Sequence, residues 1–200
     1  MAVRRPLRFA AVLALVAASF GVGGPVSAAP DISRYPYRNP CPLPFPASNV
    51  WNKPVDKLPV RTDSATLIAT MGVSRDVHPD FGTFAGYGIP YNLVSASTPR
   101  STVTFQWPSE SDRVGYPIPA SPKIEGAGAS GDRHLLMLDQ SSCRLWELFA
   151  ASFTGGHWTA GSGATWDLRS NALRTDGWTS ADAAGLPIYP GLARYDEVAS

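Results

Sequence analysis

Two apolar runs separated by a polar turn dominate the middle of the chain. Residues 133–139 and 143–150 have the length of strands, and the intervening residues 140–142 are typical of a turn. The pattern therefore predicts a β-hairpin. Its approach, residues 124–131, is rich in glycine and predicts a loop.

The register of this hairpin decides which side chains meet. If the loop has two or four residues and Leu138 lies opposite Cys143, then His134 faces Glu147 across the two strands. A slip of one residue would move the two side chains to opposite faces. We expect the register that brings them together.

The remaining pattern is mostly that of short strands. Residues 101–107 alternate between apolar and polar positions, and residues 87–94 and 157–168 have the composition of strands. Residues 62–72 predict a short helix that stops at Gly72, and further short helices are expected at 179–185 and 192–198. These elements predict a mainly β fold, an antiparallel β-sandwich or partly closed barrel with short peripheral helices.

The N-terminus has the pattern of an export signal. Three arginines precede an apolar stretch that ends in small residues at Ala28, as in a secretory signal peptide. We therefore expect a signal at 1–28, a proline-rich extended segment at 29–48 and a β-rich globular domain at 49–200. The mature chain would be secreted and would have no membrane span, because no later apolar run is long enough.

Charge excludes one class of partner. Loss of the three signal arginines leaves a slightly acidic chain without a cluster of lysine and arginine, so nucleic-acid binding is not expected. The glycines of residues 126–131 lead into a strand and not a helix, which argues against a nucleotide site. No cofactor is expected, and the chain is expected to be a monomer.

The chain has two cysteines, Cys41 and Cys143, and both lie in the exported part. An even number of cysteines in an exported chain predicts a disulfide, which here would tie the proline-rich segment to the central hairpin.

Ionisable side chains gather on and beside the hairpin. They are Glu125, Asp132, His134 and Glu147. Proton transfer needs one group that is protonated and one that is not, and two carboxylates that flank a glycosidic oxygen meet this need, with Glu125 and Glu147 as the candidate pair. The alternative is a structural hydrogen bond between His134 and Glu147, with Asp132 as a turn residue.

A metal site is a second possibility for part of this cluster. His78 and Asp80, like Asp132 and His134, are a histidine and an aspartate two positions apart. Together the four would form a ligand set that zinc or another divalent ion accepts. No established zinc spacing is present, so the metal stays unknown.

Aromatic residues are abundant for a small chain, with six tryptophans and seven tyrosines. Flat apolar rings with polar rims stack well on sugars, although most tryptophans in proteins serve in packing. The candidates for substrate binding lie beside glycine or polar turn residues: Trp107, Trp158, Trp166 and Trp178.

Several segments carry a resemblance to a known family: residues 131–139, 143–148, 161–174 and 177–188, together with 49–52 and 78–82. By these motifs the chain resembles a family of secreted, uncharacterised proteins that is common in actinobacteria. The resemblance implies no catalytic residues. It implies that members continue beyond residues 195–197 with further β structure, and a chain truncated at its C-terminus is the corresponding expectation.

Two functional hypotheses follow. The first is a secreted carbohydrate-active protein, such as a glycan hydrolase, that uses the carboxylate and histidine cluster on a polysaccharide or cell-wall glycan. The second is a non-catalytic glycan-binding or cell-envelope module in which that cluster is structural. Whether the cluster opens onto an aromatic cleft or is buried distinguishes them.

Overall fold

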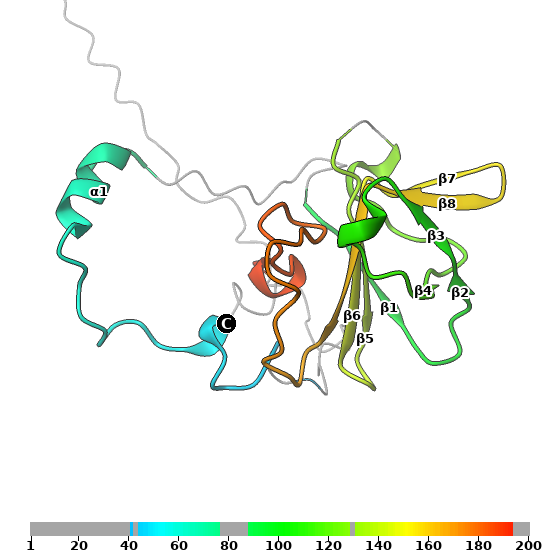
Figure 1. The fold of residues 1–200 in the computed structure, drawn as a ribbon, viewed down its shortest axis with the longest axis horizontal. Helices are drawn as coiled ribbons and strands as arrows, with labels where there is room; N and C mark the ends of the chain where they lie inside the picture. The colour runs from blue at the N-terminus through cyan, green and yellow to red at the C-terminus, as the bar shows by residue number, and fades with distance from the viewer. Residues whose placement is uncertain (1–40, 42–43, 77–87, 129–130, 194–200) are drawn as a thin grey trace, which may run out of the picture. The chain divides into compact units, whose positions relative to one another are not determined.

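The central hairpin is the middle of a four-stranded sheet. The computed structural model describes residues 41, 44–76, 88–128 and 131–193. β5 (Leu135–Asp139) and β6 (Arg144–Phe149) pair in antiparallel fashion. β1 (Tyr91–Val94) adds to β5 in parallel, as Figure 1 shows, and β9 (Ser162–Asp167) adds to β6 in antiparallel orientation. The sheet order is β1-β5-β6-β9.

Two smaller sheets accompany this one. β2 (Arg100–Ser101) pairs with β4 (Tyr116–Pro117), and β7 (Ser152–Thr154), β8 (His157–Ala160) and β3 (Val103–Phe105) form a three-stranded sheet. Figure 1 shows β7 and β8 as one hairpin. The helical elements are α1 (Ser64–Met71) and the short 3-10 turns η2 (Val50–Asn52), η3 (Pro108–Glu110), η4 (Glu125–Gly128) and η5 (Tyr189–Gly191).

The central hairpin is buried on both faces, which explains its nearly continuous apolar sequence. Leu136, Leu138 and Leu145 belong to one core cluster, which also contains Cys41, Cys143 and Tyr189. The opposite face contributes to a second cluster with side chains of the smaller sheets: Val103, Phe105, Tyr116, Leu135, Met137, Trp146 and Leu148. The hairpin therefore separates two cores.

The mainly β prediction is confirmed, and the only α-helix in the described part of the chain is short. None of the three sheets closes into a barrel among the described residues. Two of the three sheets are mixed and not purely antiparallel, because β1–β5 and β3–β8 are parallel pairs, whereas β2 and β4 pair in antiparallel fashion. Parallel strands need a long connection, and residues 95–134 separate β1 from β5.

The predicted hairpin register is wrong by two positions. Leu138 faces Leu145 and not Cys143, and Glu147 faces Leu136 and not His134. The cause is the turn, which spans residues 140–143. Asp139 accepts hydrogen bonds from the backbone N–H groups of Ser141 and Ser142, and Cys143 has a φ of 54°, so Cys143 belongs to the turn.

The first predicted helix is confirmed as α1, which ends with Gly72 at its C-cap. The helix expected at 179–185 is absent, because Ser180 turns the chain through bonds with Asp182 and Gly185 donates its N–H to the Asp182 carbonyl. Residues 157–168 form two strands divided at Gly161, where a Cβ would meet Phe149 and Trp107.

Several predictions lie outside the described residues: the signal peptide at 1–28, most of the segment at 29–48, His78 and Asp80, and all but the first two residues of the helix expected at 192–198. The predicted disulfide is confirmed, since Cys41 is bonded to Cys143 with Cα atoms 5.7 Å apart. In the described part of the chain, no helix has the length and apolar character needed to cross a membrane.

Candidate functional site

His134 and Glu125 form the one close pair within the predicted cluster. Nδ1 of His134 lies 2.6 Å from Oε2 of Glu125, which also accepts the backbone N–H of His134 at 3.2 Å. Nε2 lies 3.2 Å from the carbonyl oxygen of Ala181, so Nε2 must carry a proton and donate it. Both ring nitrogens are therefore occupied, and His134 is buried.

Asp132 does not join this pair by strand alternation. Arg133, which lies between Asp132 and His134, has a φ of 48°, and β5 begins only at Leu135. The side-chain alternation of a strand therefore does not extend back to Asp132. Asp132 is exposed, and its carbonyl accepts the backbone N–H of Ala150.

Glu147 is fully buried within the sheet face that carries the first core cluster. Its two carboxylate oxygens accept the backbone N–H of Ile188 at 3.1 and 2.9 Å, and one of them accepts that of Tyr189 at 2.8 Å. Burial raises the pKa of Glu147 to about 7, although the two N–H donors favour the charged form. Glu147 thus fastens the C-terminal segment around η5 to the sheet.

The candidate tryptophans fall into two groups. Trp107, 41% exposed, stacks on Phe149 with ring centroids 6.2 Å apart, and Trp158 packs against Phe153 at 5.0 Å. Trp166 and Trp178 line a single cavity. The structure therefore brings two of the four candidates together.

That cavity, which we call the β9 pocket, has a volume of about 320 Å3. It combines apolar and aromatic side chains with charged and hydroxyl groups near the C-terminal end of β9. The lining residues are Asp112, Arg144, Thr165, Trp166, Asp167, Ser170, Ala172, Leu173, Arg174, Thr175 and Trp178. Glu125, Asp132, His134 and Glu147 are not among them.

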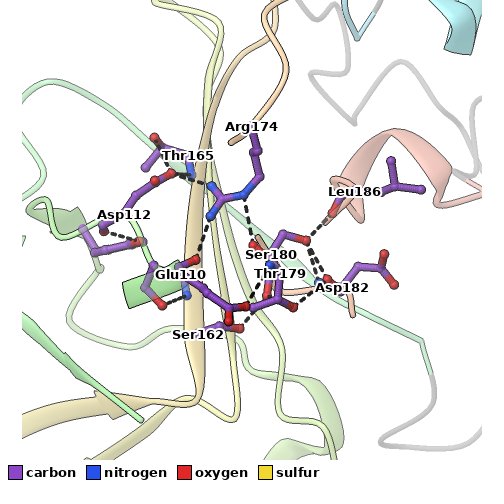
Figure 2. Close-up of polar contacts among 12 residues, drawn as sticks. Glu110, Asp112, Ser162, Thr165, Arg174, Thr179, Ser180, Asp182 and Leu186 are labelled. Carbon is purple, nitrogen blue, oxygen red and sulfur yellow. Dashed lines mark hydrogen bonds and ion pairs between the residues drawn. The ribbon is translucent and has the colours of Figure 1, made fainter. Parts of the chain in front are cut away.

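Arg174 lines one side of the β9 pocket, and Figure 2 shows the polar contacts that hold its guanidinium in place. Its guanidinium donates to the Asp112 carboxylate at 2.7 Å and to the carbonyl oxygens of Glu110 and Thr179. The Arg174 side chain is only 7% exposed. Its carbon Cζ lies 5.5 Å from the ring centre of Trp166 and 5.7 Å from that of Trp178, within the range of cation–π attraction.

Asp112 connects this network to β9. One carboxylate oxygen accepts the backbone N–H of Thr165 at 2.7 Å, and the backbone N–H of Asp112 donates to the carbonyl of Gly163 at 2.9 Å. The hydroxyl of Ser111 accepts the N–H of Gly163. Residues 111 and 112 thus bond to the outer side of β9.

Sequence reasoning missed the polar members of the β9 pocket. Asp112 lies in a stretch that shows only prolines and scattered charges, and Arg174 follows β9 in an irregular segment. Periodicity carries no signal for residues that meet through loops. The strand pair Arg144 and Asp167 could have been found from a correct alignment of β6 with β9, which places them opposite each other.

Only two of the four predicted metal ligands, Asp132 and His134, lie among the described residues. His78 and Asp80 lie outside the described residues. Within the described ranges, no group of three or more histidine, cysteine, aspartate or glutamate side chains is placed to hold a metal ion.

Comparison with known proteins identifies no match for this chain. No family model matches the chain, and no curated protein sequence and no solved structure matches it either.

Proposed function

We propose that this chain is an exported, non-catalytic carbohydrate-binding domain whose ligand occupies the β9 pocket. The observation that carries the proposal is the composition of that pocket, where Trp166, Trp178 and Leu173 occur together with Arg144 and Asp167. A sugar ring has the matching character, with apolar C–H faces and hydroxyl groups around its edge. Protein sites pair such faces with aromatic rings.

Size and shape support the same class of ligand. Pockets for small ligands have volumes of about 300–1,000 Å3, and the β9 pocket lies at the lower end of that range. Trp178 is only partly buried and Leu173 is 92% exposed, so apolar surface remains available at the rim. Such a pocket suits one or two sugar units of a longer chain.

Binding without hydrolysis is favoured by the positions of the carboxylates. A glycoside hydrolase needs two carboxyl groups that flank the scissile bond. Glu147 has no exposed surface, and both of its oxygens accept backbone N–H groups. Glu125 is engaged with His134. The alternative in which this cluster is structural therefore has the better support.

Export is part of the proposal. The N-terminal sequence has the pattern of a signal peptide. The Cys41–Cys143 disulfide is typical of proteins that fold in an oxidising compartment.

The test is a panel of insoluble and soluble polysaccharides, with retention measured by pull-down and affinity gel electrophoresis. We expect the purified chain to bind at least one glycan and the Trp178→Ala variant to bind about tenfold more weakly or worse, as for a large aromatic anchor. Trp51→Ala is the matched control, because Trp51 is 41% exposed and lies outside the pocket.

Two results would overturn the proposal. One is an absence of binding across the panel, or binding that Trp178→Ala leaves unchanged. The other is release of reducing ends by the wild-type chain that Glu147→Gln abolishes, since this would restore the hydrolase hypothesis.

A further inference from the structure

We infer that Arg144 and Asp167 determine the specificity of the β9 pocket, and that together they recognise two adjacent hydroxyl groups on a neutral sugar ring. This inference rests on the proposed carbohydrate-binding function. It goes further by naming the class of sugar and the two side chains that select it.

The two residues are placed together by the sheet. Arg144 on β6 and Asp167 on β9 are directly opposite each other, so their side chains lie on the same face, and both line the pocket. Nη2 of Arg144 lies 3.9 Å from Oδ2 of Asp167. This separation is too long for a direct hydrogen bond. Among the described residues neither atom has a hydrogen-bond partner, so each keeps its bonding capacity.

The rest of the Asp167 carboxylate is already fixed. Oδ1 accepts the backbone N–H of Arg169 at 3.0 Å and lies 3.5 Å from its Nε atom. The backbone N–H of Arg169 is the main cause of a lowered pKa for Asp167, with the charges of Arg144 and Arg169 adding to it. Asp167 is thus a charged acceptor held in one orientation, with Oδ2 available.

Arg144 provides the complementary donor. Its side chain is 47% exposed, and in the described part of the chain its guanidinium makes no contact with a carboxylate closer than that with Asp167. An arginine offers five N–H donors, and an exposed one keeps most of them for a ligand.

Arg174, the second arginine of the pocket, forms a close ion pair and so provides a contrast with Arg144. Arg174 lies 2.7 Å from Asp112, and two backbone carbonyls take further N–H groups of its guanidinium. Figure 2 shows this closed network. Its side chain is 7% exposed, against 47% for Arg144. Arg174 therefore positions the wall of the pocket, while Arg144 is free to contact a ligand.

Hydroxyl groups fit the open pair because each can both donate and accept a hydrogen bond. One hydroxyl can accept from Arg144 and its neighbour on the ring can donate to Oδ2 of Asp167, each at the usual distance of about 2.7–3.0 Å. The pocket contains two arginines and two aspartates, so its charges balance. A sugar carboxylate would lie beside Asp167 and be repelled, which favours a neutral sugar.

The experiment uses the full chain with its disulfide intact. Affinities are measured by calorimetry for xylan, mannan, β-glucan and chitin oligosaccharides, and for polygalacturonate and alginate as acidic probes. For the neutral sugar that binds, methyl glycosides lacking one of two adjacent hydroxyls are compared with the parent. We expect neutral oligosaccharides to bind, and each deoxy analogue at the recognised pair to bind about tenfold more weakly.

The variants are Arg144→Ala and Asp167→Asn, each expected to lose affinity about tenfold, with the double variant losing less than the product of the two single losses. Asp167→Asn keeps an oxygen for the N–H of Arg169, so the fold should be retained. Arg75→Ala is the control, because Arg75 is exposed and lies outside the pocket.

The outcomes separate the two proposals. Loss of binding in Trp178→Ala with affinities within twofold of wild type in Arg144→Ala and Asp167→Asn would overturn the inference and leave the proposed function in place. Preferred binding of polygalacturonate or alginate would also overturn the inference. No binding to any glycan would overturn both.

Discussion

The buried carboxylate of Glu147 is a costly feature at the scale of a single residue. Taking a charged carboxylate out of water is unfavourable, and the N–H donors of Ile188 and Tyr189 offset this only in part. Asp182 adds a repulsive charge. The consequence is a pKa of about 7, which lies well above the ordinary value of 4.5.

This shift predicts a particular dependence of stability on pH. Since the folded chain holds the proton of Glu147 more tightly than the unfolded chain, the stabilising contribution is complete below about pH 4.5 and is lost as the pH rises to about 7. The total change is on the order of 3 kcal/mol. Urea denaturation of wild type and Glu147→Gln at pH 4, 5, 6, 7 and 8 should show this fall only in wild type.

The control for this measurement is Asp56→Asn, which removes an exposed carboxylate. Its stability curve should follow that of wild type. Identical curves for wild type and Glu147→Gln would mean that Glu147 does not titrate in this range in the folded chain.

Single residues also show which contacts of the candidate site can be predicted from the sequence and which cannot. Glu125 and His134 were identified as chemistry-bearing, and the structure brings them together, yet Glu147 was expected in place of Glu125 as the histidine's partner. Gly126 at a φ of 75° and Gly131 at a φ of 141° lie between the two residues and adopt backbone conformations that favour glycine. Sequence spacing does not encode such conformations.

At the scale of elements, the hydrophobic pattern predicts where the strands lie but not how neighbouring strands align. The strands 135–139 and 144–149 follow from apolar runs, and α1 follows from its apolar spacing and Gly72. The hairpin register depended on whether Cys143 belongs to the strand or the turn. The positive φ of Cys143 and the bonds of Asp139 place it in the turn, and neither is visible in hydrophobic periodicity.

Close packing between β9 and its neighbours depends on a residue without a side chain. A Cβ at Gly163 would lie 2.5 Å from the hydroxyl oxygen of Tyr116 and 2.7 Å from a ring carbon of Phe105. Both rings are buried and cannot move away easily. We therefore expect Gly163→Ala to lower the free energy of unfolding by about 1–3 kcal/mol.

Chemical denaturation measures this effect, and Gly191→Ala is the matched control. A Cβ at Gly191 would meet Trp51 at 3.5 Å, an ordinary contact, so that variant should be close to wild type. Equal stability of the two alanine variants would contradict the packing argument.

At the scale of the whole molecule, long-range pairing explains what could not be predicted. The mainly β composition is evident from the sequence. The parallel pairs β1–β5 and β3–β8, however, join strands that are separated by long connections, and no local pattern selects them. The β9 pocket has the same origin, because Asp112 and Arg174 lie 62 positions apart.

The disulfide joins two distant parts of the chain. Cys41 and Cys143 are 102 positions apart, and both lie in the first core cluster. Closing a loop of about 100 residues removes unfolded-state entropy worth about 4–5 kcal/mol. We expect the double variant Cys41→Ala/Cys143→Ala to lose stability of this order in urea denaturation, and reduction of wild type to have a similar effect. A loss below about 1 kcal/mol would contradict this expectation.

The bonds that residues 111 and 112 make to β9 have a consequence for neighbouring copies in solution. β9 is the last strand in the described sheet, and a terminal strand with unpaired amide groups recruits further strands into aggregates. Here the N–H groups of Gly163 and Thr165 and the carbonyl of Gly163 are already bonded. These three groups are therefore unavailable to a second chain, which shields this stretch of β9 from edge-to-edge strand pairing.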